Sequence, residues 1–284
     1  MTTEYRKKPG LNYSRLAQFY RNQDHALLEP EPKSYFEHGH ALELALQDVA
    51  QDTRLYHERF FNSDCPGSLP DKIVAWIKSG DDLTEKYTYN KNGDLNKKYS
   101  RIHGLLDECQ KHPGKMPMCR DDQDLVGRML NSVLKMEIEG VPFKEVLPDC
   151  MFQVPLYWTM QGVEKKALLD IVYQTADQTY LWDLKTTANH RQFRSMFFNR
   201  YWIQYVHYTE GARKYFAGVR PMNFIVASKA EDDLFYAKEY ERDVGGNGEK
   251  FNAHYEDYLD VVKNYVRWDE AGKPLKGFMD KEII

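Results

Sequence analysis

The chain has 284 residues, of which 42% are hydrophobic, and a formal net charge of −4. This length and apolar content suffice for a large folded core, as one domain or as a core with an insertion. The mild negative charge excludes a globally basic surface for nucleic acid, although a local basic patch remains compatible with it. Because no apolar run approaches the roughly 18 residues of a membrane span and no apolar signal core opens the chain, we expect a cytoplasmic protein without a membrane partner.

The cysteines are few and scattered, without the CxxC spacing of a zinc site or a disulfide framework. We therefore expect free thiols and no iron–sulfur cluster. The positions concerned are Cys65, Cys109, Cys119 and Cys150.

The N-terminal part of the sequence predicts two helices, over residues 13–21 and 35–51, separated by Pro30 and Pro32. Residues 65–140 are polar and punctuated by turn signals, and their clearest helix spans 121–139, where acidic residues occupy the favoured N-terminal end. This stretch reads as a helical insertion or cap.

After Pro148 the pattern changes to that of an αβ core. The alternation of apolar and polar residues predicts strands, with a turn at Gln161-Gly162, and two long helices complete the order βββαββα. The strands are expected at 152–160, 165–174, 178–185, 223–228 and 234–240, and the helices at about 196–216 and 250–268.

Two neighbouring predicted strands each carry one carboxylate within an apolar run. Asp170 lies within the second strand, and Asp183 follows Trp182 in the third, with Lys185 two positions later. Residues i and i+2 share one face of a strand, so Asp183 and Lys185 project together. A short turn at 175–178 lets the strands pair antiparallel and brings Asp170 towards Asp183. Two carboxylates beside an ammonium suit a hard divalent cation and an activated water.

An isolated Asp-x-Lys is usually a solvated strand end or a surface ion pair. The flanking residues argue against that reading here, because a charge within an apolar run is costly unless it is paired or bound to metal. The pattern therefore predicts a metal-dependent hydrolase site.

This order of elements, with Asp170 and the Asp183-Leu184-Lys185 triplet on consecutive core strands, resembles the PD-(D/E)XK nuclease superfamily. The following helix carries Gln204 and Tyr208 at a spacing that puts both on one face, which resembles the RecB/RecE-like branch, including phage exonucleases of the exonuclease VIII type. The resemblance implies an α/β (α+β) fold with a restriction-endonuclease-like core, a mixed central sheet flanked by helices, and a helical insertion.

The resemblance also implies the roles of the site residues. Asp170 and Asp183 would bind Mg²⁺ or Mn²⁺ together with the backbone carbonyl of Leu184, and Lys185 would position or deprotonate the attacking water or stabilise charge on the phosphate. Gln204 and Tyr208, which on an arbitrary helix would be plain surface, would contact DNA phosphate or support the active site.

Two positions depart from the family pattern. Where a metal-binding histidine usually follows a glycine by four residues, this chain has Glu43 after Gly39, with His40 as the alternative ligand. We favour Glu43, an oxygen ligand suited to Mg²⁺. Gln153 stands where the family often has an acidic residue near the start of the first core strand, which puts that acid's role in doubt.

A basic and aromatic stretch lies between the third strand and the helix after it, at 190–202. Cations alternating with aromatic rings suit a phosphate track with base stacking, although some of these rings are expected in the core. We expect DNA contacts from Arg191 and Arg194, with Lys165, Lys166, Arg213 and Lys214 extending the track. His207 lies about 100° around the helix from Tyr208 and is expected to be structural.

Residues 1–284 are thus expected to form one nuclease domain. It would comprise N-terminal helices of the core (1–64), a mostly helical insertion (65–147), the catalytic core (148–270) and a tail (271–284). By resemblance, the protein would be a Mg²⁺-dependent exonuclease that resects linear duplex ends 5′ to 3′ in phage-type recombination, in a bacterial or phage-infected cell. A single-strand annealing protein would be its partner and a ring its assembly. The alternatives are a RecB-like nuclease acting on single strands or endonucleolytically, and an inactive DNA-binding or scaffold protein of the same fold.

Overall fold

The computed structural model describes residues 3–23, 26, 35–68, 91–94, 100–138, 140–189, 192–230, 237–240 and 249–273. The chain divides into two compact units. The first unit comprises Met1–Pro30, Asp149–Ala227 and Lys238–Ile284, and the second comprises Glu31–Pro148 and Ser228–Ala237. The first unit therefore resumes at Asp149, next to the expected start of the catalytic core at 148.

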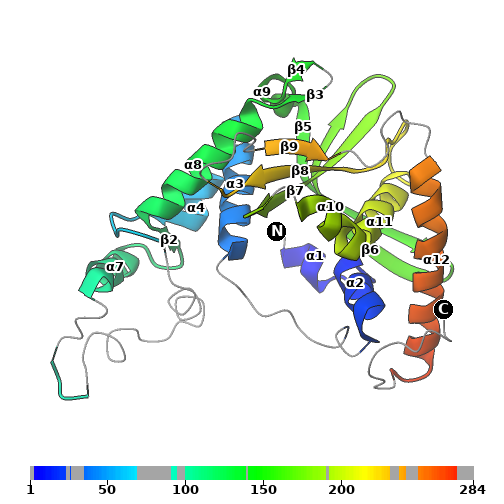
Figure 1. Cartoon of the computed structure of the whole chain (residues 1–284), viewed down its shortest axis with the longest axis horizontal. Helices are drawn as coiled ribbons and strands as arrows, with labels where there is room; N and C mark the ends of the chain where they lie inside the picture. The colour runs from blue at the N-terminus through cyan, green and yellow to red at the C-terminus, as the bar shows by residue number, and fades with distance from the viewer. Residues whose placement is uncertain are drawn as a thin grey trace. The chain divides into compact units, whose positions relative to one another are not determined.

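The first unit is built on a five-stranded sheet with strand order β5-β6-β7-β8-β9 (Figure 1). β5, β6 and β7 form an antiparallel meander, whereas the arrows of β7 and β8 run in the same direction in Figure 1. The sheet is mixed and helices flank it, which confirms the predicted α/β fold class. The strands span Cys150–Met160, Val163–Gln174, Thr179–Thr187, Asn223–Ser228 and Ala237–Tyr240.

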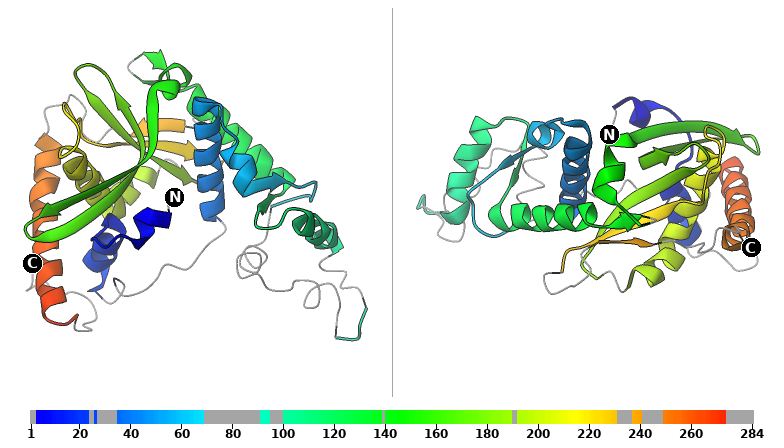
Figure 2. Two further views of the ribbon diagram at one scale, coloured as in Figure 1. Left: turned by 180° about the vertical axis from the view of Figure 1, so that it is seen from behind. Right: turned by 90° about the horizontal axis from the view of Figure 1, so that it is seen from above.

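The β5–β6 hairpin turns at Gln161-Gly162, as the sequence predicts; it is seen from behind in the left view of Figure 2. Both turn residues have positive φ, 51° at Gln161 and 75° at Gly162. A two-residue loop with both φ angles positive has the twist that matches antiparallel strands. It fixes the register that begins with Met160 opposite Val163 and continues to Cys150 opposite Tyr173.

The helix after β7 is the centre of the first unit. It is built from α10 (Phe193–Met196), a π-helical turn (Phe197–Tyr201) and α11 (Trp202–Ala212). Every residue of α11 is buried, because α11 packs against β5, β6, α2 (Tyr13–Arg21) and α12 (Glu249–Glu270). A helix covered on all sides needs no polar face. The helix predicted at about 196–216 is wrong at its end, because α11 stops at Ala212 and residues 213–215 form a turn.

Asn12 caps the N-terminus of α2, and its side chain accepts a hydrogen bond from the Arg15 N–H at 2.9 Å. Just before this cap, Leu11 pairs with β6: its N–H donates to the Glu164 carbonyl at 2.9 Å, and its carbonyl accepts from the Lys166 N–H at 3.0 Å. The short α1 (Thr3–Lys7) precedes this contact. The N-terminal segment is thereby attached to the first half of β6.

The second unit contains helices and two small sheets. α3 packs against α8, and His38 Nε2 on α3 lies at hydrogen-bond distance, 2.8 Å, from Oδ1 of the buried Asp122 on α8. α3 belongs to the second unit, whereas α1 and α2 belong to the first. The helices are α3 (Tyr35–Gln51), α4 (Leu55–Arg59), α7 (Ser100–Lys111), α8 (Arg120–Leu134) and α9 (Phe143–Val146).

One helix of the second unit ends earlier than the sequence predicts. α8 ends at Leu134, not at 139, because β3 (Glu137–Ile138) pairs antiparallel with β4 (Val141–Pro142) through a turn at Gly140, whose φ is 80°. The other sheet pairs β1 (Phe60–Asn62) with β2 (Met116–Met118) in parallel. Among the helices in the described part of the chain, none is long and apolar enough to cross a membrane.

The packing of α11 on the sheet generates a prediction at Gly211. A methyl group there would lie 2.8 Å from ring carbons of Trp158 on β5, whose indole N–H donates to Glu210. Overpacking of this kind costs about 1 to 3 kcal/mol, so Gly211→Ala should lower the free energy of unfolding by that amount. Urea denaturation followed by circular dichroism measures the change.

Gly127 on α8 is the matched control, because it is also helical and a methyl group there would meet nothing within 4 Å. Gly127→Ala should raise stability by about 1 kcal/mol through helix propensity alone. Equal effects at the two glycines would contradict the close packing described for α11.

Candidate active site

The candidate site lies where β6 and β7 part. Their register pairs Gln174 with Thr179 and ends with Ile171 opposite Trp182, so the next pair in the same register is Asp170 and Asp183. Directly opposite residues of an antiparallel pair point to the same face. In place of a further ladder bond, the Leu184 N–H donates to Asp170 Oδ2 at 3.0 Å. The two carboxylates that the sequence analysis selected are thereby brought to one place.

Asp183 is almost fully buried, with 3% of its surface exposed. One carboxylate oxygen accepts a hydrogen bond from Gln204 Nε2, and the other forms an ion pair with Lys185 Nζ. Burial alone would lower the pKa of Lys185, but the Asp183 carboxylate, aided by Tyr13, Tyr201 and Asp170, outweighs burial and raises that pKa above its ordinary value. Lys185 is therefore held as an ammonium against Asp183.

Gln204 and Tyr208 lie on α11 and are not surface residues, since only 1% and 7% of them is exposed. Gln204 reaches Asp183 directly. Burial raises the pKa of Tyr208 well above its ordinary value, and Tyr13, Asp183 and Asp170 add to the rise, so the phenol stays neutral and can donate a hydrogen bond.

Two tyrosines that the sequence analysis did not select also border the site. The ring of Tyr13, at the start of α2, meets that of Tyr208 edge-on with centroids 5.4 Å apart. Tyr201, in the π-helical turn, has its ring centroid 5.1 Å from Lys185 Nζ. The pairing of Leu11 with β6, two residues before Tyr13, is what brings Tyr13 here, and no local sequence pattern announces such a contact.

The β5–β6 register pairs Phe152 with Ile171 and Val154 with Leu169, which places Gln153 on β5 opposite Asp170. Its Nε2 lies 3.3 Å from Asp170 Oδ1, so each site carboxylate has a glutamine amide as donor. The backbone of Gln153 has a φ of 50°, a left-handed conformation that costs an L-residue about 1 kcal/mol. Strain of this kind is found where surrounding structure holds a functional side chain in place.

The donor set at the fork fits a divalent cation. Within the part of the chain that the structure describes, Asp183 Oδ2 is buried and its one polar contact is the ion pair with Lys185, while Gln204 Oε1 is buried without a hydrogen-bond partner. Among the described residues, no group of three or more His, Cys, Asp or Glu side chains converges on one point. The first unit would therefore contribute two carboxylates and the Leu184 carbonyl, with water filling the remaining positions of the hard cation.

The expected helix ligands Glu43 and His40 belong to α3, in the second unit. Glu43 accepts a hydrogen bond from Gln47 Nε2 at 3.3 Å, and its other oxygen lies 3.6 Å from His40 Nδ1. Which of the two serves the metal stays a prediction.

Some residues of the expected phosphate track are buried, so that part of the prediction is wrong. Arg194 is exposed on α10, whereas Arg191 lies outside the described residues. Lys165 and Lys166 are buried, with 1% and 8% exposed, and cannot contact DNA. Several rings of the basic and aromatic stretch also belong to the core and cannot stack on bases, namely Phe193, Phe197, Tyr201 and Trp202.

The buried lysines take part in a polar network behind the site. Lys165 Nζ donates to the Tyr258 hydroxyl at 2.8 Å. The His207 ring bridges two groups: its Nδ1 lies 2.7 Å from the Tyr258 hydroxyl, and its Nε2 lies 3.0 Å from the Lys166 carbonyl oxygen. Burial lowers the pKa of Lys165 to about 8 against the opposing effect of Glu210, and burial beside Lys165 lowers the pKa of His207 to about 3. His207 thus joins β6, α11 and α12.

Comparison with known proteins gives a structural likeness and no sequence family. No protein-family model matches the chain, and no curated protein matches it. A solved structure from Eubacterium rectale, described as a "Putative exonuclease", is similar over 100% of this chain and 92% of that chain, with 11% identity and a TM-score of 0.52. At this identity the likeness shows a shared fold alone. Another solved structure, described as SSO0001, aligns over 80% of this chain and 86% of that chain at 11% identity, but its TM-score of 0.28 carries no argument.

The geometry at Gln153 can be tested against a second glutamine with nearly the same backbone. Gln161, with a φ of 51°, is exposed in the β5–β6 turn. Glycine relieves positive-φ strain at either position, but only Gln153→Gly also removes a donor to a carboxylate. Gln153→Gly should therefore be less stable than Gln161→Gly by about 1 to 2 kcal/mol, as measured by urea denaturation. Indistinguishable effects would show that the amide of Gln153 does not hold Asp170.

Proposed function

We propose that this protein is a metal-dependent nuclease that hydrolyses phosphodiester bonds in DNA. The observation that carries the proposal is the meeting of Asp170, Asp183 and Lys185 at the β6–β7 fork, with Asp183 buried and bound by Gln204. Buried charges in a core are costly, and this arrangement is the one that two-carboxylate metal chemistry requires. The likeness in fold to a structure described as an exonuclease adds support.

The residues have distinct roles in this proposal. Asp170, Asp183 and the Leu184 carbonyl would hold Mg²⁺ or Mn²⁺, with Glu43, or alternatively His40, completing the protein ligands. When bound, the cation would lower the pKa of a water and neutralise charge on the scissile phosphate and the leaving oxygen. Lys185, as a compact cation, would orient the attacking water or stabilise the negative charge that develops on the phosphate.

The remaining residues position these groups. Gln204 fixes one oxygen of Asp183, and Gln153 fixes one oxygen of Asp170. The neutral Tyr208 hydroxyl would donate to a phosphate oxygen or to another group of the site. Arg194, exposed on α10, and Arg191 would contact the DNA backbone, where each contact raises the salt dependence of binding.

The finer features of the proposal rest on the family resemblance of the motifs. The protein would be a RecE-like exonuclease that resects linear duplex ends 5′ to 3′ in phage-type recombination. It would act in the cytoplasm as a ring-shaped homo-oligomer, with a single-strand annealing protein as its partner. A RecB-like nuclease for single strands or internal sites, and an inactive scaffold that binds DNA, are the outcomes that the following experiment separates from it.

End-labelled linear duplex DNA should lose one strand from its 5′ end with Mg²⁺ or Mn²⁺, and should stay intact in EDTA. Asp183→Asn removes the buried charge with little change of shape and should reduce the rate at least about a thousandfold, because the lost carboxylate would hold the cation that activates the water and neutralises the phosphate. Gel analysis of labelled products over time measures both effects.

Asp177→Asn is the matched control, since Asp177 is exposed in the turn at the other end of β6 and β7. This variant should cleave like wild type. Degradation of closed circles or of single strands alone would favour the RecB-like nuclease. Equal, negligible activity of wild type and Asp183→Asn on every DNA form would leave the scaffold.

A further inference from the structure

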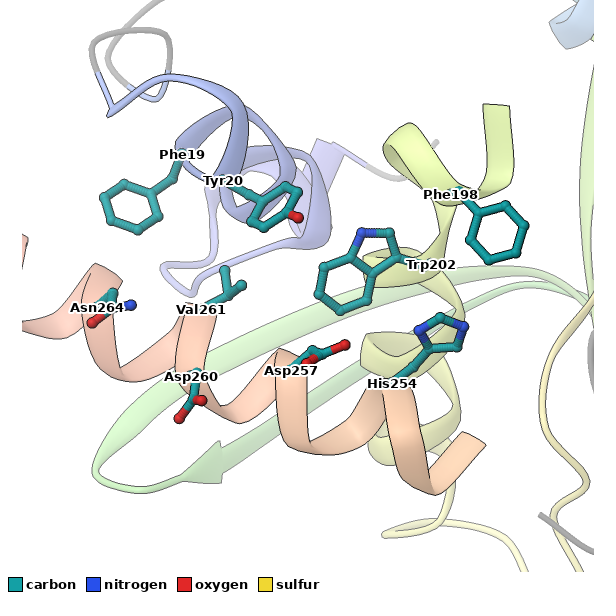
Figure 3. A pocket seen from close by; sticks show the side chains of 9 residues that line it. All are labelled: Phe19, Tyr20, Phe198, Trp202, His254, Asp257, Asp260, Val261 and Asn264. Carbon is teal, nitrogen blue, oxygen red and sulfur yellow. The ribbon is translucent and has the colours of Figure 1, made fainter. Parts of the chain in front are cut away.

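An aromatic pocket lies on the first unit between α2, the π-helical turn with the start of α11, and α12 (Figure 3). Its volume is about 310 Å³, at the small end of the range for ligand sites. Two of the three large aromatic side chains exposed in the described residues line it, Tyr20 at 37% and Phe198 at 42% exposure. Exposed rings gathered in a concave site commonly mark a binding surface.

The floor of this pocket is Trp202. Its indole ring meets Tyr20 edge-on with centroids 5.4 Å apart, and it stacks on His254 at 5.8 Å and 27°. Figure 3 shows Trp202 between these two side chains. Both contacts fix the orientation of the tryptophan, which is only 5% exposed, so the ring surfaces open to a ligand are those of Tyr20 and Phe198.

The charge in the pocket is negative and only partly balanced. Asp260 forms an ion pair with Lys263 at 3.1 Å. Asp257 lines the same pocket, and within the described part of the chain it has neither an ion pair nor a hydrogen bond. In Figure 3 the Asp257 carboxylate points towards Trp202 and His254, whereas Asp260 points away from them. Exposed aromatic rings beside an exposed carboxylate that is unpaired among the described residues suit a cationic ligand.

We propose that this pocket binds an arginine side chain from a partner polypeptide. A guanidinium is planar, so it can stack on an aromatic face while its N–H fork pairs with a carboxylate such as Asp257. A phosphate-bearing strand is disfavoured, because two carboxylates line the pocket and would repel it. The pocket therefore serves a basic protein segment, and it does so separately from the site at the β6–β7 fork and independently of the proposed nuclease activity.

The test uses the full chain labelled with ¹⁵N, in EDTA, and follows the indole N–H signal of Trp202, which is assigned from Trp202→Phe. A tri-arginine peptide should shift this signal in a saturable way. The tri-citrulline peptide has nearly the same shape without charge and should bind at least about tenfold more weakly. Spermidine, a free cation without a planar face, should also bind more weakly than tri-arginine.

Variants on α12 locate the contact. Asp257→Asn should weaken tri-arginine binding about five- to tenfold, since it removes one charge-assisted contact. Glu256→Gln removes a neighbouring exposed charge outside the pocket lining and should change the affinity less than about twofold.

Four results would overturn the proposal. The first is that saturating tri-arginine peptide does not shift the Trp202 signal, and the second is that the tri-citrulline peptide binds equally well. The third is that Asp257→Asn and Glu256→Gln weaken tri-arginine binding equally. The fourth is that spermidine binds more tightly than tri-arginine, which would make the pocket a site for free polyamines. If a thymidine oligonucleotide shifts the Trp202 signal, and the shift is larger in Asp257→Asn than in wild type, the pocket would instead be assigned to DNA.

Discussion

The arrangement of the first unit depends on how β6 changes its partners along its length. Its first half pairs with β5 and with Leu11, and its second half pairs with β5 and β7. At the change, the Asp170 side chain accepts the Leu184 N–H that would otherwise continue the ladder. A half-buried N–H also needs an acceptor, so the carboxylate that is proposed for chemistry also ends the strand pairing. The same divergence admits Leu11, and with it Tyr13, to the site.

The buried helix α11 supports this fork from behind. It presents Gln204 to Asp183, and two more of its polar side chains are hydrogen-bonded, His207 to Tyr258 and Glu210 to Trp158. Such a helix tolerates little adjustment, because each buried polar group would be costly if it lost its partner. The position of Gln204 is therefore set by packing on α12 and β5 as much as by its own hydrogen bond.

Local patterns predicted the parts of this structure that local physics determines. Alternation and turn residues gave β5, β6, β7 and β8 to within two residues, and the i, i+2 rule joined Asp183 with Lys185. Long-range packing decided the rest. The burial of Lys165 beside Tyr258, the approach of Tyr13 to Tyr208 and the grouping of α3 with α8 join segments far apart in the chain. The strained φ of Gln153 likewise has no signal in a β-forming sequence.

The central claim is that the two carboxylates at the fork form a divalent cation site, and calorimetric titration with Mn²⁺ tests it without reference to DNA or turnover. Wild type should bind the ion, and both Asp170→Asn and Asp183→Asn should weaken binding by more than about tenfold, while Asp177→Asn binds like wild type. Absence of binding by the folded wild type, or equal affinity in all four proteins, would contradict the account.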